Sequence, residues 1–224
     1  NIWTLAQLSR GCPFRREYLV YRNLENSGYA YIPQGVEYQS NGMESTLSMP
    51  ALNTLSGDIY ANRVYLEKCI HTLHGLEWEP SLGYGWVDSR VEGIESLRGG
   101  YESWADFLSE YLDRYLPESE NRESYQEYIE IILADPTIHG PMALVHRDIK
   151  WSNWLEHPDN SSQIFLVDWE NAMLVPQSHA YIIESTSYLV SYGFDPFWSA
   201  LLIPETAQLS LFYAYSSIFW LGAN

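Results

Sequence analysis

Apolar residues follow a mixed helix and strand pattern in the first quarter of the chain. Helical spacing of apolar positions predicts a helix over 14–26, which ends before Gly28. Residues 30–38 and 45–52 then predict two strands separated by a polar turn. The small residues of 48–56 form the best candidate for a boundary between two lobes.

The rest of the chain has mainly helical patterns. Helices are expected over 58–73, 104–115, 122–134, 177–192, 197–202 and 205–221. Asp58 and Ser103 are plausible N-caps, and Pro117 ends the second of these helices. The glycine-punctuated stretch 76–100 is expected to be a loop.

Two short apolar runs interrupt the helical part. Residues 142–145 and 164–167 predict a small hairpin-like pair of strands, with a polar loop after the first strand. The order of elements indicates an α+β fold. We expect residues 1–52 to form one partial lobe with a hinge, and 53–224 to form a mainly helical lobe.

Composition and charge restrict the partners. The 224 residues are 46% hydrophobic and 15% aromatic, which is ample for a packed core. Twelve basic and 29 acidic residues give a formal net charge of −17, which disfavours nucleic acid as a partner. Such a surface suits a cationic small molecule, although excess carboxylates also serve solubility alone.

The chain also carries indications of its compartment. Cys12 and Cys69 are far apart and have no metal-type spacing, which favours buried thiols in a reducing compartment over a disulfide. No signal-peptide pattern opens the sequence. The apolar stretch 209–223 is shorter than the roughly 20 residues that a membrane span needs, so a buried helix is expected there. We therefore expect a cytoplasmic protein without a membrane partner.

Residues 144–172 carry the candidate chemistry. Asp148, Lys150 and Asn153 follow the first apolar run, and Asp168 follows the second. Carboxylate and amide oxygens at the ends of two strands provide ligands for Mg²⁺ when substrate phosphates complete the shell. A carboxylate base and a lysine beside them predict phosphoryl transfer from a nucleotide such as ATP. The alternative for Lys150 is an ordinary solvated surface lysine without a catalytic role.

The same stretch resembles a known superfamily. Residues 146–153, HRDIKWSN, resemble the protein-kinase catalytic loop H-R-D-L-x-x-x-N. Residues 168–172, DWENA, depart from the kinase D-F-G and resemble the aminoglycoside phosphotransferase and choline kinase superfamily, which has a protein-kinase-like fold. The stretch 66–76 and the sequence GYGW at 83–86, followed by Asp88, are also similar to segments of that group. The resemblance extends over 14–224, and only 144–172 is specific.

The resemblance implies a role for each motif residue. Asp148 is the expected catalytic base and contacts the substrate hydroxyl, with Lys150 as a second catalytic residue. Asn153 and Asp168 are the expected Mg²⁺ ligands and part of the ATP site. His146 is expected to hold the loop in place. Glu170 either supports the metal or binds substrate, or is a plain surface acid.

The front of the chain departs from the superfamily pattern. Residues 1–13 contain neither a glycine-rich phosphate loop nor a lysine. Glu17 lies on the first helix, where a glutamate that pairs with such a lysine is expected. Either the chain begins after the lysine or the fold has lost it, and the missing initiator methionine favours a fragment or a processed form. Met49 and Ala51 lie at the expected hinge and either offer backbone groups to adenine or are simply a linker.

Two further groups of side chains suit a cationic substrate. The tryptophans around the motif either bind a quaternary ammonium or, more simply, fill the core; they are Trp151, Trp154 and Trp169. Acidic residues that can form a cationic substrate site are Asp88, Glu170, Glu184, Asp195 and Glu205.

Three functions remain open from the sequence. The first is an ATP-dependent small-molecule kinase that phosphorylates a hydroxyl of a cationic, aminoglycoside- or choline-like acceptor. The second is a protein Ser/Thr kinase relative, which HRDIK favours and the missing A-P-E disfavours. The third is a truncated or degenerate kinase-like domain that binds a ligand without activity by itself.

Overall fold

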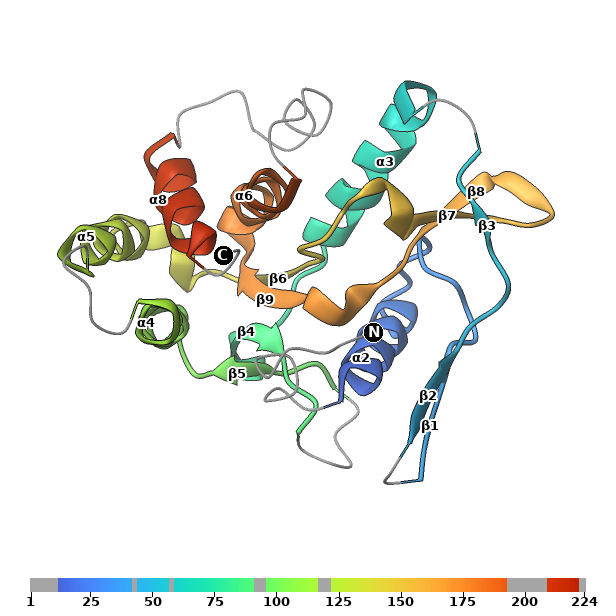
Figure 1. Ribbon diagram of the computed structural model, residues 1–224, viewed down its shortest axis with the longest axis horizontal. Coiled ribbons are helices and arrows are strands. Elements are labelled where there is room, and N and C mark those ends of the chain that lie inside the picture. The colour runs from blue at the N-terminus through green and yellow to red at the C-terminus, as the bar shows by residue number, and fades with distance from the viewer. Residues whose placement is uncertain are drawn as a thin grey trace.

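The fold is described from a computed structural model, over residues 12–41, 44–56, 59–90, 96–116, 122–192 and 209–221. The expected helix at 197–202, the start of the helix expected at 205–221, and the capping and stop residues Asp58 and Pro117 lie outside these ranges. Figure 1 shows the helices that follow residue 103 gathered on one side of the molecule and the ribbon of residues 37–48 on the other. The strand at 142–145, which leads into the candidate motif, lies between them.

The first part of the chain contains one helix and one hairpin. Helix α2 (Pro13–Asn26) buries most of the apolar residues that its spacing predicted, together with Arg16 and Glu17. Strands β1 (Glu37–Ser40) and β2 (Ser45–Ser48) pair antiparallel. Both are shorter than predicted. Before β1, Pro33 has no N–H to donate to a ladder and Gly35 has a φ of 71°, and after β2, Pro50 likewise has no N–H to donate.

The helical part largely follows the predictions. Its helices are α3 (Ile59–His74), α4 (Trp104–Tyr115), α5 (Arg122–Leu133), α6 (Ala180–Tyr192) and α8 (Leu209–Trp220). Ser103 Oγ accepts a hydrogen bond from Asp106 N at 3.1 Å, which confirms it as the N-cap of α4. Helix α6 begins later than predicted, because Gln177–His179 forms a 3₁₀ turn, η5.

The predicted hairpin of 142–145 with 164–167 is wrong. Strand β6 (Met142–Val145) pairs with β9 (Met173–Pro176) in a four-stranded sheet ordered β5-β4-β9-β6. Every residue of β6 and β9 is buried, so each of these strands finds its partner inside the core. The second apolar run belongs to β8 (Asn160–Leu166), which forms a hairpin with β7 (Trp154–His157) beside β3 (Asn53–Thr54).

The stretch 76–100 is not the plain loop that its glycines predicted. It contains the 3₁₀ turn η1 (Pro80–Leu82), strand β4 (Tyr84–Val87) and the start of β5 (Gly99–Tyr101). Gly85 has a φ of 89°, and a Cβ there would lie 2.8 Å from Phe107 Cδ2. The glycine that hid the strand is therefore what lets it pack against α4.

A single hydrophobic cluster joins these elements. It includes the apolar faces of α2, α3, α4 and α8 and both central strands of the sheet. Cys12 and Cys69 are free thiols, as expected, but only Cys69 is buried and Cys12 is partly exposed. Among the described helices, none has the length and apolar character that crossing a membrane requires.

Candidate active site

The loop after β6 is held by His146. Its ring is fully buried, and Nε2 lies 2.9 Å from the carbonyl oxygen of Val167. Its Nδ1 accepts a hydrogen bond from Asp148 N at 3.1 Å, so the proton of the neutral ring belongs on Nε2. His146 thus ties the loop that carries Asp148 to the end of β8, the supporting role expected of it.

Glu184 on α6 fixes the loop from the other side. Its carboxylate accepts hydrogen bonds from His146 N at 2.8 Å and from Arg147 N at 2.7 Å. Burial alone would raise the pKa of this carboxyl, but His74 and His146 lower it. Glu184 is 1% exposed. The prediction that it helps to bind a cationic substrate is therefore wrong, because both its oxygens serve the loop.

Arg147 shows what this anchoring maintains. It has a φ of 69°, a left-handed conformation that costs a non-glycine residue about 1–2 kcal/mol. Its guanidinium lies 4.1 Å from the centre of the Phe219 ring on α8, and burial lowers its pKa. The loop is therefore held in a strained shape that the surrounding core supports.

Asp148, Lys150 and Asn153 form one hydrogen-bonded group. Lys150 Nζ donates to Asp148 Oδ2 at 2.6 Å. Asn153 Nδ2 donates to the same oxygen at 3.1 Å and to the backbone oxygen of Asp148 at 2.8 Å. Lys150 is therefore not simply a solvated lysine, since its amine is held at the candidate base.

Asp168 joins this group from β8. Val167 N donates to the backbone oxygen of Asn153 at 2.9 Å, which brings the two expected metal ligands together. Asp168 itself adopts a left-handed conformation, with φ 71° and ψ 59°. Burial raises its pKa, and the charge of Asp148 adds to the rise, while His146, Lys150 and Asn153 oppose it.

Two more acids, Glu170 and Glu17, interact electrostatically with Asp168. Burial raises the pKa of Glu170, and Asp168 raises it further. Glu17 on α2 accepts hydrogen bonds from Tyr21 Oη at 3.1 Å and from Trp169 N at 3.4 Å. Burial and the charge of Asp168 raise the pKa of Glu17 to about 7. Glu17 thus docks α2 on the turn after Asp168, and Glu170 is not a plain surface acid.

The excess of negative charge at this point suits a divalent cation. Burial raises the pKa values of Glu17, Asp168 and Glu170, and repulsion from neighbouring acids of this set, Asp148 included, raises them further. In the described ranges, no group of three or more His, Cys, Asp or Glu side chains could hold a metal by itself. A carboxylate with an amide oxygen, completed by phosphate oxygens, needs no such group.

The other predicted residues lie elsewhere. Met49 and Ala51 lie outside this group, on the exposed connection between β2 and β3, and their contact with adenine stays a prediction. Trp154 and Trp169 are fully buried and belong to the core, which answers the choice between core and ammonium cage for these two. Asp195 and Glu205 lie outside the described residues.

The fold is similar to those of solved aminoglycoside phosphotransferase and choline kinase structures. A thermostable mutant of aminoglycoside phosphotransferase APH(4)-Ia matches with a TM-score of 0.60 and 17% identity, over 93% of this chain and 73% of that chain. Its ternary complex with AMP-PNP and hygromycin B matches with a TM-score of 0.61, at the same identity and coverage. Choline kinase LicA from Streptococcus pneumoniae matches with a TM-score of 0.51 and 15% identity, over 98% of this chain and 75% of that chain.

These likenesses are structural. The sequence matches no protein-family model and no curated protein. The structural matches confirm the predicted protein-kinase-like α+β fold, and the resemblance to aminoglycoside phosphotransferases and choline kinases is confirmed at the level of fold.

Proposed function

We propose that this chain transfers the γ-phosphoryl group of ATP to a hydroxyl group of a small cationic acceptor in the cytoplasm. The observation that carries the proposal is the convergence of Asp148, Lys150, Asn153 and Asp168 at the ends of β6 and β8. These side chains supply the base, the positive charge and the metal ligands that phosphoryl transfer requires. The acidic surface, with a formal net charge of −17, favours a cationic acceptor.

Asp148 has the position of the base. It is 9% exposed, and Lys150 and Asn153 fix its carboxylate from one side. In the proposed reaction it accepts the proton of the acceptor hydroxyl as that oxygen attacks the γ-phosphorus and the bond to the leaving ADP oxygen breaks. Lys150 then offers positive charge to the transferring group, since its amine already lies at Asp148.

Asn153 and Asp168 are the residues that would hold Mg²⁺, with Glu170 in support. The ion would bind the ATP phosphates and neutralise the charge that they carry. The raised pKa values of Asp168 and Glu170 support this assignment, because a bound cation relieves the repulsion among buried carboxylates.

The segment after Asp168 favours a small-molecule acceptor over a protein. The chain enters β9 at Met173 and reaches α6 at Ala180, so a short connection replaces the long activation segment of protein kinases. The structural matches to an aminoglycoside phosphotransferase and a choline kinase agree with this choice.

An acceptor panel tests the proposal. The protein is incubated with ATP and Mg²⁺ together with hygromycin B, other aminoglycosides, choline, ethanolamine or a generic protein substrate, and mass spectrometry detects phosphorylated product. We expect product with a small cationic alcohol. Product with the protein substrate alone would favour the protein-kinase alternative, and no product with any acceptor would favour a binding domain without activity.

A further inference from the structure

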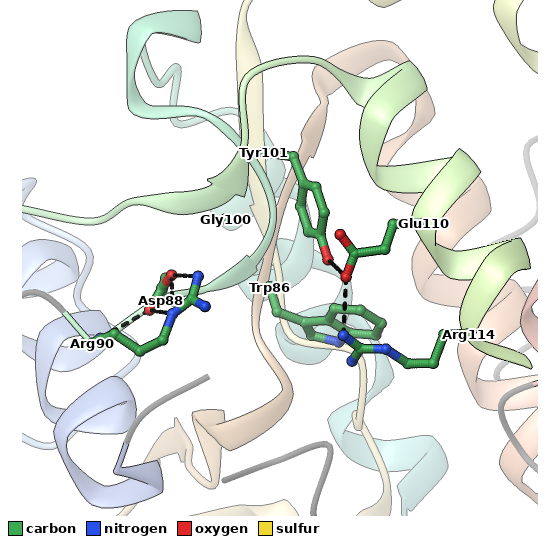
Figure 2. Close-up of a pocket in the computed structure, with 7 residues that line it drawn as sticks. All are labelled: Trp86, Asp88, Arg90, Gly100, Tyr101, Glu110 and Arg114. Atoms are coloured by element: carbon green, nitrogen blue, oxygen red, sulfur yellow. Dashed lines mark hydrogen bonds and ion pairs between the residues drawn. The ribbon is translucent and has the colours of Figure 1, made fainter. Parts of the chain in front are cut away.

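A cavity of about 140 Å³ lies between β4, β5 and α4, outside the group of residues around Asp148. Figure 2 shows its lining, which combines aromatic rings with two ion pairs. The lining residues are Trp86, Asp88, Arg90, Gly100, Tyr101, Glu110 and Arg114. The proposed function does not use them.

The sheet places this cavity at the same end of its strands as the candidate active site. Strands β4 and β6 both run antiparallel to β9, and Trp86 and Val145 are paired with Met173 from opposite sides. The ends of β4 and β6 therefore point the same way. The loop with Asp148 follows the end of β6, and Asp88 follows the end of β4 on the same side.

One hydrogen bond and one shared electrostatic partner connect the two regions. Val87 N donates to the backbone oxygen of Ala172 at 3.1 Å, two residues after Glu170. The buried Arg16 interacts electrostatically with both regions: burial lowers its pKa, and the charges of both Glu170 and Asp88 oppose that change. The cavity and the acidic group around Asp168 are thus neighbours at one end of the strands of the sheet.

The charges in the lining are arranged unequally. Arg90 donates to both oxygens of Asp88, so that carboxylate is saturated. In contrast, Tyr101 Oη at 2.9 Å and Arg114 at 3.0 Å both donate to Oε1 of Glu110. Within the described residues no hydrogen bond reaches Glu110 Oε2, and Figure 2 shows both contacts ending on the other oxygen.

This arrangement fits a polar ring that carries an ammonium group. Glu110 Oε2 can accept from the ammonium, and the Tyr101 ring offers a face that attracts a cation. Arg90 binds Asp88 through Nε and Nη2, so its other guanidinium N–H groups can donate to hydroxyl oxygens. A cavity of about 150 Å³ in another protein holds one benzene ring, so this volume of about 140 Å³ suits one such ring and not a whole multi-ring molecule.

The sheet also sets the length of the acceptor. Neighbouring strands lie about 4.8 Å apart, so β4 and β6 are separated by about 10 Å, and the cavity lies on the far side of β4. A molecule as short as choline cannot reach Asp148 and the cavity together. An acceptor with two or more linked rings can.

We propose that this cavity is a distal acceptor subsite that binds one amine-bearing, hydroxylated ring of a multi-ring acceptor whose reacting hydroxyl lies at Asp148. Glu110 is its specificity-determining residue. The inference rests on the proposed function for the position of the reacting hydroxyl, and its binding chemistry stands on the residues of the cavity.

Calorimetric titration without nucleotide tests the subsite separately from catalysis. Hygromycin B and kanamycin serve as multi-ring probes, and choline serves as the short probe. We expect at least one multi-ring probe to bind, and Glu110→Gln to weaken that binding at least about tenfold, because the substitution replaces the accepting Oε2 with an amide donor. Binding of choline, if measurable, is expected to be the same in both proteins.

Two variants control the experiment. Glu127→Gln on α5 makes the same change of charge at an exposed position away from the cavity, and it should leave every affinity unchanged. Tyr101→Phe removes the hydroxyl that orients Glu110 and should weaken multi-ring binding to a smaller extent. Melting temperatures of all variants check that they are folded.

The outcomes separate this proposal from the proposed function. Absence of multi-ring binding, or equal effects of Glu110→Gln and Glu127→Gln, would overturn the subsite. Phosphorylation of choline with no multi-ring binding would keep the proposed function and reject the subsite. Multi-ring binding that depends on Glu110, without any phosphoryl transfer, would keep the subsite and reject the proposed function.

Discussion

The group around Asp148 and the cavity beside β4 lie at the same end of parallel strands in one sheet, but they hold their charges in different ways. Asp148 is 9% exposed and Glu184 is 1% exposed, and each is fixed by at least two hydrogen bonds. In the cavity, the side chains of Arg90 and Glu110 are 58% and 50% exposed. This difference indicates that the reacting centre is rigid, whereas the wall of the cavity can adjust to a ligand.

The comparison predicts opposite kinetic effects in the two regions. We expect Asp148→Asn to lower the rate of phosphoryl transfer by about 10²–10⁴, because a positioned base contributes that much, with little change in acceptor affinity. Glu110→Gln should instead raise KM. Initial rates with varied acceptor distinguish these effects, and Asp159→Asn, at an exposed turn, is the control. Loss of affinity without loss of rate in Asp148→Asn would remove the distinction.

Stability should depend most on the residue behind the loop. Glu184→Ala leaves His146 N and Arg147 N without acceptors, and each buried N–H that loses its partner costs about 1–3 kcal/mol. We therefore expect the free energy of unfolding to fall by about 2–5 kcal/mol in urea titrations. Glu184→Gln keeps one accepting oxygen and should lose less. Equal losses in the two variants would contradict this account of the anchor.

Gly85 packs tightly behind Tyr101, one of the residues that line the cavity. Gly85→Ala combines a strained φ with a Cβ that would lie 2.8 Å from Phe107 and 2.9 Å from Tyr101. We expect a loss of about 2–4 kcal/mol in the free energy of unfolding. Gly100→Ala adds a Cβ whose nearest neighbours lie at 3.9 Å, so it should change stability by less than about 1 kcal/mol. Similar values for the two variants would show that β4 does not need its glycine.

The buried acid Glu17 predicts a pH dependence of stability. Its pKa is about 7 in the folded protein and near the ordinary 4.5 when unfolded, so between these values the folded state binds more protons. The contribution of Glu17 to stability therefore falls as pH rises from about 4.5 to 7, by at most about 3 kcal/mol. Urea titrations across this range should show that Glu17→Gln lacks this component. Parallel curves for both proteins would contradict the raised pKa.

The sequence foretold the reacting centre because its residues are close neighbours along the chain. Asp148, Lys150 and Asn153 lie within six positions, and Asp168 follows the next apolar run, so motif spacing alone brought them together. Glu184 was placed wrongly, since nothing in the spacing of α6 shows that a carboxylate faces two backbone N–H groups. The signal available was a lone acid in an otherwise apolar and hydroxyl-bearing helix.

The sheet and the cavity were hidden for two reasons. Residues 142–145 and 164–167 have the same apolar character, and only the burial of β9 decides that Met173–Pro176 is the true partner of β6. The cavity draws its lining from β4, β5 and α4, and glycines at 83, 85, 99 and 100 gave that stretch the appearance of a loop. Local patterns do not report contacts between separated segments.

The central claim is that the acids at the ends of β6 and β8 bind a nucleotide through Mg²⁺. The most direct test compares the melting temperature of the protein and of Asp168→Asn, a variant that keeps the left-handed backbone accessible, with AMP-PNP in the presence and absence of Mg²⁺. At a ligand concentration of about 100 Kd, binding stabilises the folded protein by about 2.7 kcal/mol, which is roughly 5–10 °C for a chain of this size. We predict such a shift in the unsubstituted protein only with Mg²⁺, and its loss in Asp168→Asn. An equal shift in both proteins, or none in either, would contradict the account.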